Sequence, residues 1–377
     1  MWSVQRANRE PEAIEAAIRA LFSSLGYSPH GTVFVKPNLC GRAPISEGEQ
    51  TTVYFMDALL AVLHEQECDV IIGHTSLMGT ADRAYPFEKV IADAGFDKYR
   101  GAQGTALLDL DDVPRRDVVV GGHVHHVPEV VFEADSYINL AKMKTHMEAG
   151  VSLSLKNQMG LMLQAERISA HRRGLDEPIA EFAVACVPTI SIVEGIVAME
   201  GNGPHHGEDK YVGVVLAGTD MVELDSAIAV RSGMNPKTVG HISRAAELGA
   251  GSIASAMSSS EDDDLAFALA PAQRMLTKGL QLWVFPTTSC SRCITALNEA
   301  GKEMARALPD ALVFARAALL PRDTSIVIGK PREGDLPRGR VYCIGKCACE
   351  GYTGEAARLS VCPPSVSQVR SFLKEHL

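Results

Sequence analysis

Apolar and polar positions alternate along residues 10–248 with the spacings of helices and strands. Alanines and leucines from Glu10 to Leu25 recur at helical spacing until Gly26 interrupts them. Thr32 to Val35 is a β-branched run, which is typical of a strand. The same criteria predict further helices at 51–67, 87–94, 177–185, 220–230 and 238–248, and further strands at 69–73, 136–140, 189–193 and 211–216. Residues 118–124 are predicted to form a hairpin around Gly121 and Gly122. This alternation predicts a layered α/β fold with a mostly parallel sheet.

Two domains are expected from the length and from the distribution of cysteines. A chain of 377 residues is too long for one compact core. Six of the nine cysteines lie from Cys290 onward, after a polar, acidic stretch at 258–264. We therefore expect a main α/β domain at 1–257 and a smaller α+β cysteine module at 265–377.

Charge excludes two classes of partner. The chain has 36 basic and 46 acidic residues and a net charge of −10, whereas proteins that bind nucleic acids or anionic membranes are usually basic. The N-terminus lacks the layout of a signal peptide, and no apolar run approaches the ~20 residues that span a bilayer. These features predict a cytoplasmic protein, in which cysteines more often bind metals than form disulfides.

The stretch from Ile138 to Met162 concentrates candidate chemistry. Lys142, Lys144 and His146 alternate, so in an extended segment their side chains share one face. Residues 142–173 contain six basic and two acidic residues in a chain that is acidic overall. This pattern predicts a site that binds a carboxylate or a phosphate, and His146 is a candidate proton carrier or metal ligand.

Lys156 and Asn157 extend this candidate site, because they follow the apolar run VSLSL and precede QMGLM. A lysine in such a run is expected to be buried and to need a partner. Lys142 and the more distal arginines are instead expected on a solvated surface.

Three more segments add candidates that are weak when taken alone. Lys36 and Asn38 follow the first predicted strand, at the end where α/β sheets bind ligands, but they also suit a turn. Glu200 lies in the predicted loop MEGNGP, where glycines let the backbone approach a ligand or simply form a tight turn. Asp220 opens the predicted helix at 220–230.

A family resemblance raises the weight of these segments. VFVKPNL, INLAKMKTH with LSLKNQMG, IVEGIVAMEGNGPHHG and the segment from Gly218 to Asp225 occur in that order. Together they resemble the domain of unknown function family 362, over about Val33 to about Gly251. The resemblance implies an iron–sulfur-linked redox role without a named activity, because members are often joined to iron–sulfur modules. It makes the following residues site candidates: Lys36, Asn38, Lys144, His146, Lys156, Asn157, Glu200 and Asp220.

The later cysteines predict a metal centre. A CxxC at Cys290 and Cys293 is followed by Cys347 in a Gly-Lys-Cys sequence and by Cys362 in Cys-Pro-Pro. Thiolates suit iron–sulfur clusters and zinc, and we expect these four cysteines to be the ligands. Cys343 lies in an apolar run and suits a buried position, and Cys349 is a spare thiol or an alternative ligand. The family favours a 4Fe-4S cluster, with zinc as the alternative, although its usual run of closely spaced cysteines is missing here.

These sites predict an iron–sulfur oxidoreductase, or a cluster-dependent enzyme, that acts on a small anionic metabolite and exchanges electrons with a partner. In this hypothesis Lys144, Lys156 and Asn157 hold the anion, and His146 moves a proton or binds a metal. Two non-enzymatic alternatives remain: a metal-binding or electron-carrier accessory protein, and a zinc-stabilised small-molecule binder. Neither GxGxxG nor GxxxxGK[ST] occurs between a predicted strand and a predicted helix, so no nucleotide cofactor is indicated.

Overall fold

The computed structural model describes residues 1–41, 43–80, 83–146, 149–253, 275–277, 280–284, 291–306, 324–329, 337 and 339–376. The chain forms two compact units. The first comprises Met1–Leu77, Pro86–Arg167 and Leu175–Ala270, and the second comprises Met78–Tyr85, Ile168–Gly174 and Pro271–Leu377. The expected boundary between 257 and 265 lies outside the described residues and stays a prediction.

An eight-stranded sheet forms the centre of the first unit, with the path β1-β12-β11-β9-β2-β3-β6 and with β10 paired to β9. The pairs among β11, β9, β2, β3 and β6 are parallel, whereas β1, β12 and β10 join antiparallel. The predicted mostly parallel sheet is therefore confirmed. The strands are β1 (Trp2–Arg6), β2 (Thr32–Lys36), β3 (Asp69–His74), β6 (Thr105–Asp109), β9 (Ser136–His146), β10 (Gly150–Ser152), β11 (Ile190–Asn202) and β12 (His206–Gly218).

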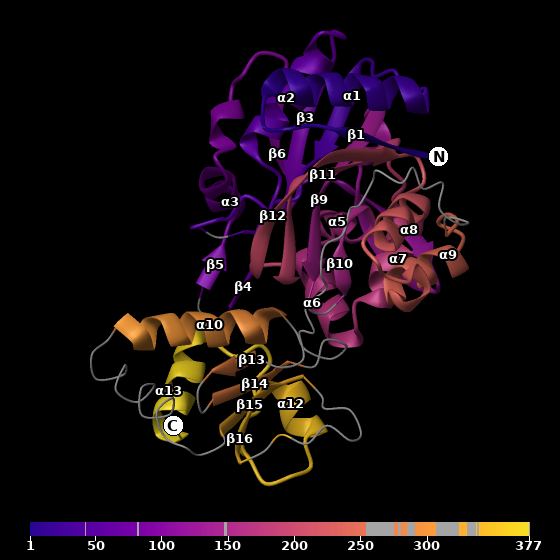
Figure 1. The fold of residues 1–377 in the computed structure, drawn as a ribbon. Coiled ribbons are helices and arrows are strands. Elements are labelled where there is room, and N and C mark those ends of the chain that lie inside the picture. The colour runs from indigo at the N-terminus through magenta and orange to yellow at the C-terminus, as the bar shows by residue number, and fades with distance from the viewer. Residues whose placement is uncertain are drawn as a thin grey trace. The chain divides into compact units, whose positions relative to one another are not determined.

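Helices cover both faces of this sheet. Figure 1 shows α1 and α2 side by side on one face and α7, α8 and α9 grouped on the other. In α1, Ile14, Ile18 and Leu21 recur at helical spacing and are fully buried. The helices and 3₁₀ turns are α1 (Pro11–Leu25), α2 (Val53–His64), α3 (Phe87–Ala94), η1 (Asp97–Tyr99), α4 (Val130–Glu133), α5 (Ser154–Asn157), η2 (Gln158–Leu161), α6 (Gln164–Arg173), α7 (Asp176–Ala185), α8 (Met221–Arg231), η3 (Pro236–Thr238) and α9 (Gly240–Glu247).

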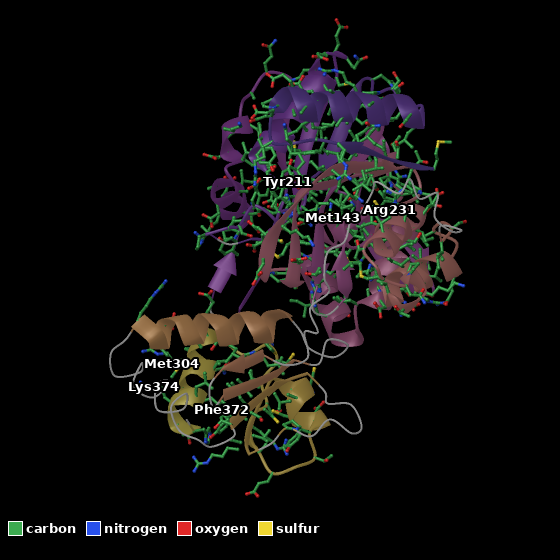
Figure 2. The ribbon with its side chains drawn as sticks, viewed as in Figure 1. Met143, Tyr211, Arg231, Met304, Phe372 and Lys374 are labelled. Carbon is green, nitrogen blue, oxygen red and sulfur yellow. The ribbon has the colours of Figure 1, made fainter. Side chains whose placement is uncertain are left out.

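Two strands are longer than the sequence predicted. Strand β9 continues to His146 because it pairs with β11 on one side and its last residues pair with β10, so the KMKTH segment is strand and not loop. Met143 of this strand lies in the interior (Figure 2). Strand β11 continues to Asn202 by pairing with β12, so Glu200 also lies in a strand.

Two hairpins are separate from this sheet. One joins β7 (Arg115–Val120) and β8 (His123–Pro128), and Gly121 and Gly122 both have positive φ in its turn, as the sequence predicted for a glycine hairpin. The other joins β4 (Leu77–Thr80) and β5 (Arg83–Tyr85).

The second unit has its own five-stranded sheet, in the order β13-β14-β15-β16-β17. Met304 of α10 and Phe372 of α13 are buried, and these two helices pack together (Figure 2). The predicted smaller C-terminal part with strands and helices is thus confirmed. Its elements are β13 (Met275–Thr277), β14 (Leu280–Val284), α10 (Ser291–Arg306), β15 (Thr324–Ile328), β16 (Arg340–Ile344), α12 (Lys346–Gly351), β17 (Ala357–Leu359) and α13 (Val366–His376).

Candidate functional site

The candidate residues gather where the strand order reverses. From β2 the chain passes through α2 to β3 on one side, and from β9 it passes through α7 to β11 on the other side. Strands β2 and β9 are parallel neighbours, so their carboxyl ends lie together at this switch point. Open α/β sheets bind ligands outside such a point. Lys36 ends β2, and Lys144 and His146 end β9.

Amide side chains connect the two strand ends. The Asn157 Oδ1 atom accepts hydrogen bonds from Asn38 Nδ2 at 2.9 Å and from Lys36 Nζ at 3.4 Å. The Asn157 Nδ2 group donates to Asn139 Oδ1 at 2.8 Å. The structure therefore brings together three of the predicted residues, Lys36, Asn38 and Asn157.

Lys144 joins the same network and is 1% exposed. Its Nζ atom lies 2.8 Å from Asn38 Oδ1, 2.9 Å from Cys40 Sγ and 2.6 Å from the Glu49 carbonyl oxygen. The ammonium of Lys36 contacts the Pro37 carbonyl oxygen at 2.5 Å in addition to Asn157. Within the described parts of the chain, neither lysine has a carboxylate partner.

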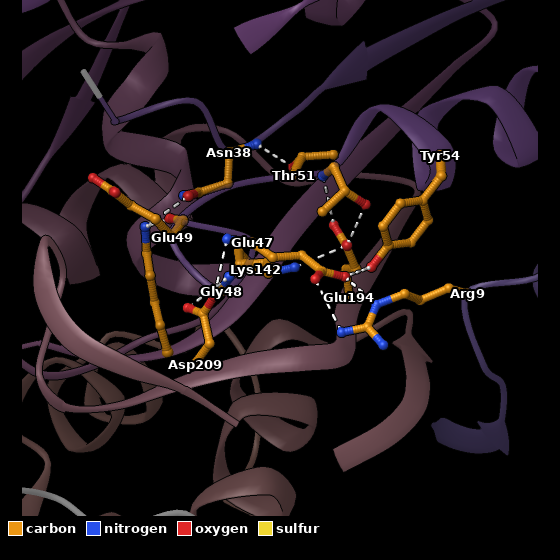
Figure 3. Close-up of polar contacts among 12 residues, drawn as sticks. Arg9, Asn38, Glu47, Gly48, Glu49, Thr51, Tyr54, Lys142, Glu194 and Asp209 are labelled. Carbon is orange, nitrogen blue, oxygen red and sulfur yellow. Dashed lines mark hydrogen bonds and ion pairs between the residues drawn. The ribbon is translucent and has the colours of Figure 1, made fainter. Parts of the chain in front are cut away.

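Lys142 provides the contrasting case on the same strand. It is fully buried, and its Nζ atom lies 2.8 Å from Glu194 Oε1, which also accepts a hydrogen bond from the Thr52 hydroxyl at 2.7 Å (Figure 3). The prediction of a solvated surface position for Lys142 is therefore wrong. Because Glu194 balances its charge, Lys142 has no need of a ligand.

Burial and neighbouring cations lower the pKa of Lys36. Burial is the larger cause, followed by the positive charge of Arg167 and, more weakly, that of Lys144, and together they lower the pKa to about 7. Burial together with Lys36 lowers the pKa of His74 well below its ordinary value. A Cβ added to Gly160 would lie 2.5 Å from Lys36 Nζ, so this glycine makes room for the ammonium.

Arg167 was expected on the surface, but it is buried beside this cluster, at 6% exposed. Its Nη1 atom donates to the Ser76 carbonyl oxygen at 2.9 Å. Its Nε and Nη2 atoms are buried without a hydrogen-bond partner in the part of the chain that the structure describes, and Asp111 Oδ1 is 4.0 Å from Nη2. Burial lowers its pKa to about 10. The sequence did not indicate that Arg167 is buried, because the residues of α6, which carries it, are mostly polar.

Asp225 of α8 holds the short helix α5, and through it positions Asn157. Its carboxylate accepts hydrogen bonds from the backbone N–H groups of Ser154 and Leu155 at 2.9 Å each, and from the Ser154 hydroxyl at 2.6 Å. These are the first residues of α5, which ends at Asn157. Burial raises the pKa of Asp225 to about 7. The sequence placed Asp225 at the edge of a family motif but indicated no role for it.

For the remaining predicted residues, the contacts found among the described residues lie outside this network. Lys156 is half-buried, and its charge adds to the burial that lowers the pKa of His241 to about 3. Glu200 pairs with Lys210 at 3.0 Å, and Asp220 caps α8 by accepting the Glu223 N–H at 2.9 Å. His146 is buried at the end of β9, and its Nδ1 atom accepts the Ala149 N–H at 3.2 Å. Their roles in binding or catalysis stay predictions.

The predicted cysteine ligands lie in the second unit, except that Cys290 is outside the described residues. Cys293 is buried on α10, and a Cβ added to Gly345 would lie 2.7 Å from its sulfur atom. The sulfur thus lies close to the segment that carries Cys347 at the start of α12. Cys343 belongs to the hydrophobic core of this unit, in agreement with its predicted packing role.

Comparison with known proteins places the first unit in a family. Residues 33–230 match the sequence model of the domain of unknown function DUF362. The chain belongs to the DUF362 family. A thylakoid-associated protein of Synechocystis sp. is 28% identical over 254 residues, which are 61% of this chain and 73% of that protein.

One solved structure is also similar to this DUF362 protein. It is the lactate racemase apoprotein from Thermoanaerobacterium thermosaccharolyticum, with a TM-score of 0.38 and 13% identity, over 85% of this chain and 68% of that chain. Among the described residues, no helix is long and apolar enough to cross a membrane. The predicted cytoplasmic location stays a prediction.

Proposed function

We propose that this DUF362 protein is an iron–sulfur enzyme that binds a small anionic metabolite at the carboxyl ends of β2 and β9. The observation that carries the proposal is the buried guanidinium of Arg167, whose Nε and Nη2 atoms have no hydrogen-bond partner among the described residues. Leaving buried donors of a charged group unsatisfied costs about 1–3 kcal/mol or more. A bound carboxylate or phosphate would satisfy both atoms, because the guanidinium fork matches its oxygens.

The surrounding charges support an anion in this position. Lys36, Lys144 and Arg167 lie near enough that the other two cations lower the pKa of Lys36. Asp111, at 4.0 Å from Arg167, is the one carboxylate within ion-pair distance of these three side chains in the described parts. Buried charges need a counter-charge. Lys142 has one in Glu194, so it does not add to the unbalanced positive charge of the proposed site.

Lys36 is suited to moving a proton on the bound anion. The pKa of Lys36 in the free protein is about 7, close to neutral pH, where a general acid or base is effective. Asn157 and the Pro37 carbonyl oxygen hold its Nζ atom in place. His146, the proton carrier expected from the sequence, would act from the neighbouring strand end.

The cysteine module would supply the cofactor. Cys293, Cys347 and Cys362, with Cys290, would hold a 4Fe-4S cluster, and such a cluster supplies electron transfer when bound. The close approach of the Cys293 sulfur to Gly345, two residues before Cys347, supports a shared ligand set. The same thiolates suit zinc, in which case the module would be structural. An electron-carrier accessory protein remains the non-enzymatic alternative.

Anion binding tests the proposal directly. Isothermal titration calorimetry with a panel of small carboxylates and phosphates, on metal-free protein, should identify ligands whose affinity falls by at least about tenfold in Arg167→Met. We expect Arg244→Met to bind like the wild type, because Arg244 pairs with Glu177 and Glu247 on the surface. Equal affinities in wild type and Arg167→Met for every ligand would contradict the proposed site.

A further inference from the structure

A second group of potential ligands adjoins the lysine network. Cys40 and Glu49 lie in the loop that follows β2, and His205 lies in the turn between β11 and β12. One ligand atom from each lies within 4.8 Å of the other two, and His205 Nδ1 is 2.5 Å from Glu49 Oε1. Glu49 and His205 are 156 positions apart along the chain, so only the fold brings them together.

The loop that carries Cys40 and Glu49 is held by partners on other elements. Asp209 of β12 accepts hydrogen bonds from the Ser46 hydroxyl at 2.8 Å and from the N–H groups of Glu47 and Gly48 at 3.1 and 3.0 Å (Figure 3). A Cβ on Gly48 would lie 2.5 Å from the Ala198 carbonyl oxygen, so the loop packs directly on β11. These contacts fix the backbone next to Glu49.

The turn that carries His205 is fixed in a similar way. The Thr145 hydroxyl donates to the carbonyl oxygen of Gly201, near the end of β11, at 2.8 Å, which ties the strand end before the turn to β9. A Cβ on Gly203 would lie 2.1 Å from the Thr145 carbonyl oxygen, so only glycine allows this close packing. The ligand atoms are therefore presented by segments that are attached to neighbouring strands, which supports a defined geometry for a metal ion.

We propose that Cys40, Glu49 and His205 bind one divalent transition-metal ion of the zinc class. A thiolate, an imidazole and a carboxylate are the ligand types that zinc takes, and three protein ligands leave a fourth position open, as in catalytic zinc sites. Lys144 donates to the Cys40 sulfur at 2.9 Å and would stabilise the thiolate as an outer hydrogen-bond partner.

The charges favour an anion in the open position. A divalent ion with one thiolate, one carboxylate and a neutral imidazole is neutral overall, and the ammonium of Lys144 adds one positive charge. The metal would therefore present a further anion-binding position beside Lys144. The inference goes beyond the proposed function, because its ligands are different residues and neither the Arg167 site nor the cysteine module is needed for it.

Cobalt provides the test, because a thiolate bound to Co²⁺ adds a charge-transfer absorption in the near ultraviolet. Metal-free, full-length protein is titrated with Co²⁺ without oxygen, and the spectrum of Cys40→Ser is subtracted from that of the wild type. Any contribution from the C-terminal cysteines is common to both and cancels. We expect a difference band that saturates at about one Co²⁺ per chain.

Two further variants separate ligation from folding. Glu49→Gln keeps an oxygen that can accept the His205 hydrogen bond but removes the negative charge, and it should weaken Co²⁺ binding at this site by more than about tenfold. Cys68→Ser, at a buried cysteine outside the site, should bind like the wild type. Circular dichroism checks that each variant is folded. If Cys40→Ser does not fold, the affinity of Glu49→Gln for Co²⁺ tests the proposal instead.

Absence of the difference band, or unchanged binding in folded Glu49→Gln, would overturn the proposal and leave the contact between His205 and Glu49 as a structural hydrogen bond. The Arg167 titration uses metal-free protein, so its outcome is independent of this one.

Discussion

Among single residues, the three lysines near the carboxyl ends of β2 and β9 differ in how their charge is balanced. Lys142 has a buried carboxylate partner, whereas among the described residues Lys36 and Lys144 contact neutral oxygens and one sulfur. Burying a charge without a counter-charge destabilises the fold, so these two positions are costly unless a ligand is bound. Stability measurements can therefore detect this cost in the free protein.

Lys36→Met should stabilise the free protein at neutral pH. Between the folded-state pKa of about 7 and the ordinary value of 10.5, the unfolded chain holds a proton on Lys36 that the folded protein has lost. Lys36 therefore destabilises the folded protein by the full amount below pH 7. This destabilisation becomes smaller as the pH rises from 7 to 10.5, so the free energy of unfolding increases over that range. We expect the variant to be more stable by ~2–4 kcal/mol at pH 6 and by little at pH 10.

Denaturant unfolding of both proteins from pH 6 to pH 10 measures this difference. A constant difference across the range would show that Lys36 has an ordinary pKa and would contradict its role as the base. Loss of anion affinity in the same variant would link the destabilising charge to ligand binding.

At the scale of elements, α5 depends on Asp225 for its position. The carboxylate accepts two N–H groups at the start of this one-turn helix, which has no other described side-chain cap and whose last residue is Asn157. A helix this short is not stable alone. The geometry of the amide network is thus set by a residue on α8.

Asp225→Asn should loosen α5. One carboxylate oxygen becomes an amide NH₂ that cannot accept, so a buried N–H of Ser154 or Leu155 loses its partner at a cost of about 1–3 kcal/mol. Hydrogen exchange of residues 153–157 should accelerate, and anion affinity should fall. Asp57→Asn, at an exposed carboxylate paired with Lys98, is the control and should change neither. Unchanged exchange in Asp225→Asn would show that packing alone positions α5.

The sequence predicted elements well where the pattern is local. The glycine hairpin and the helix at 87–94 match β7–β8 and α3, because turn residues and helical spacing act within a few positions. The end of β9 was missed because a run with two lysines and a histidine resembles a loop, and its burial depends on Glu194, which is 52 positions away. Arg167 and Asp225 were missed for the same reason, since their partners are distant in sequence.

For the whole molecule, the two compact units predict separable unfolding. Each has its own sheet and its own buried core. A bound cluster stabilises only the unit that holds its ligands. Calorimetry of anaerobically purified protein should show two transitions, and iron chelation should lower the temperature of one of them.

Metal and sulfide analysis identifies the cofactor in the same sample. About four irons and four sulfides per chain would support a single 4Fe-4S cluster. A colourless protein with zinc in place of iron would contradict the iron–sulfur proposal and favour a structural zinc module. If calorimetry instead shows a single transition whose temperature does not change on chelation, the cysteines hold no metal.

The buried pair of Lys142 and Glu194 also has an evolutionary consequence. Its members lie opposite each other on β9 and β11, so losing one leaves the other as an unbalanced buried charge, whereas an apolar pair of similar volume can replace both. Positions 142 and 194 should therefore change together as DUF362 sequences diverge. Positions 36 and 144 have no such companion in the described parts of the chain and should retain lysine in every lineage that keeps the anion site.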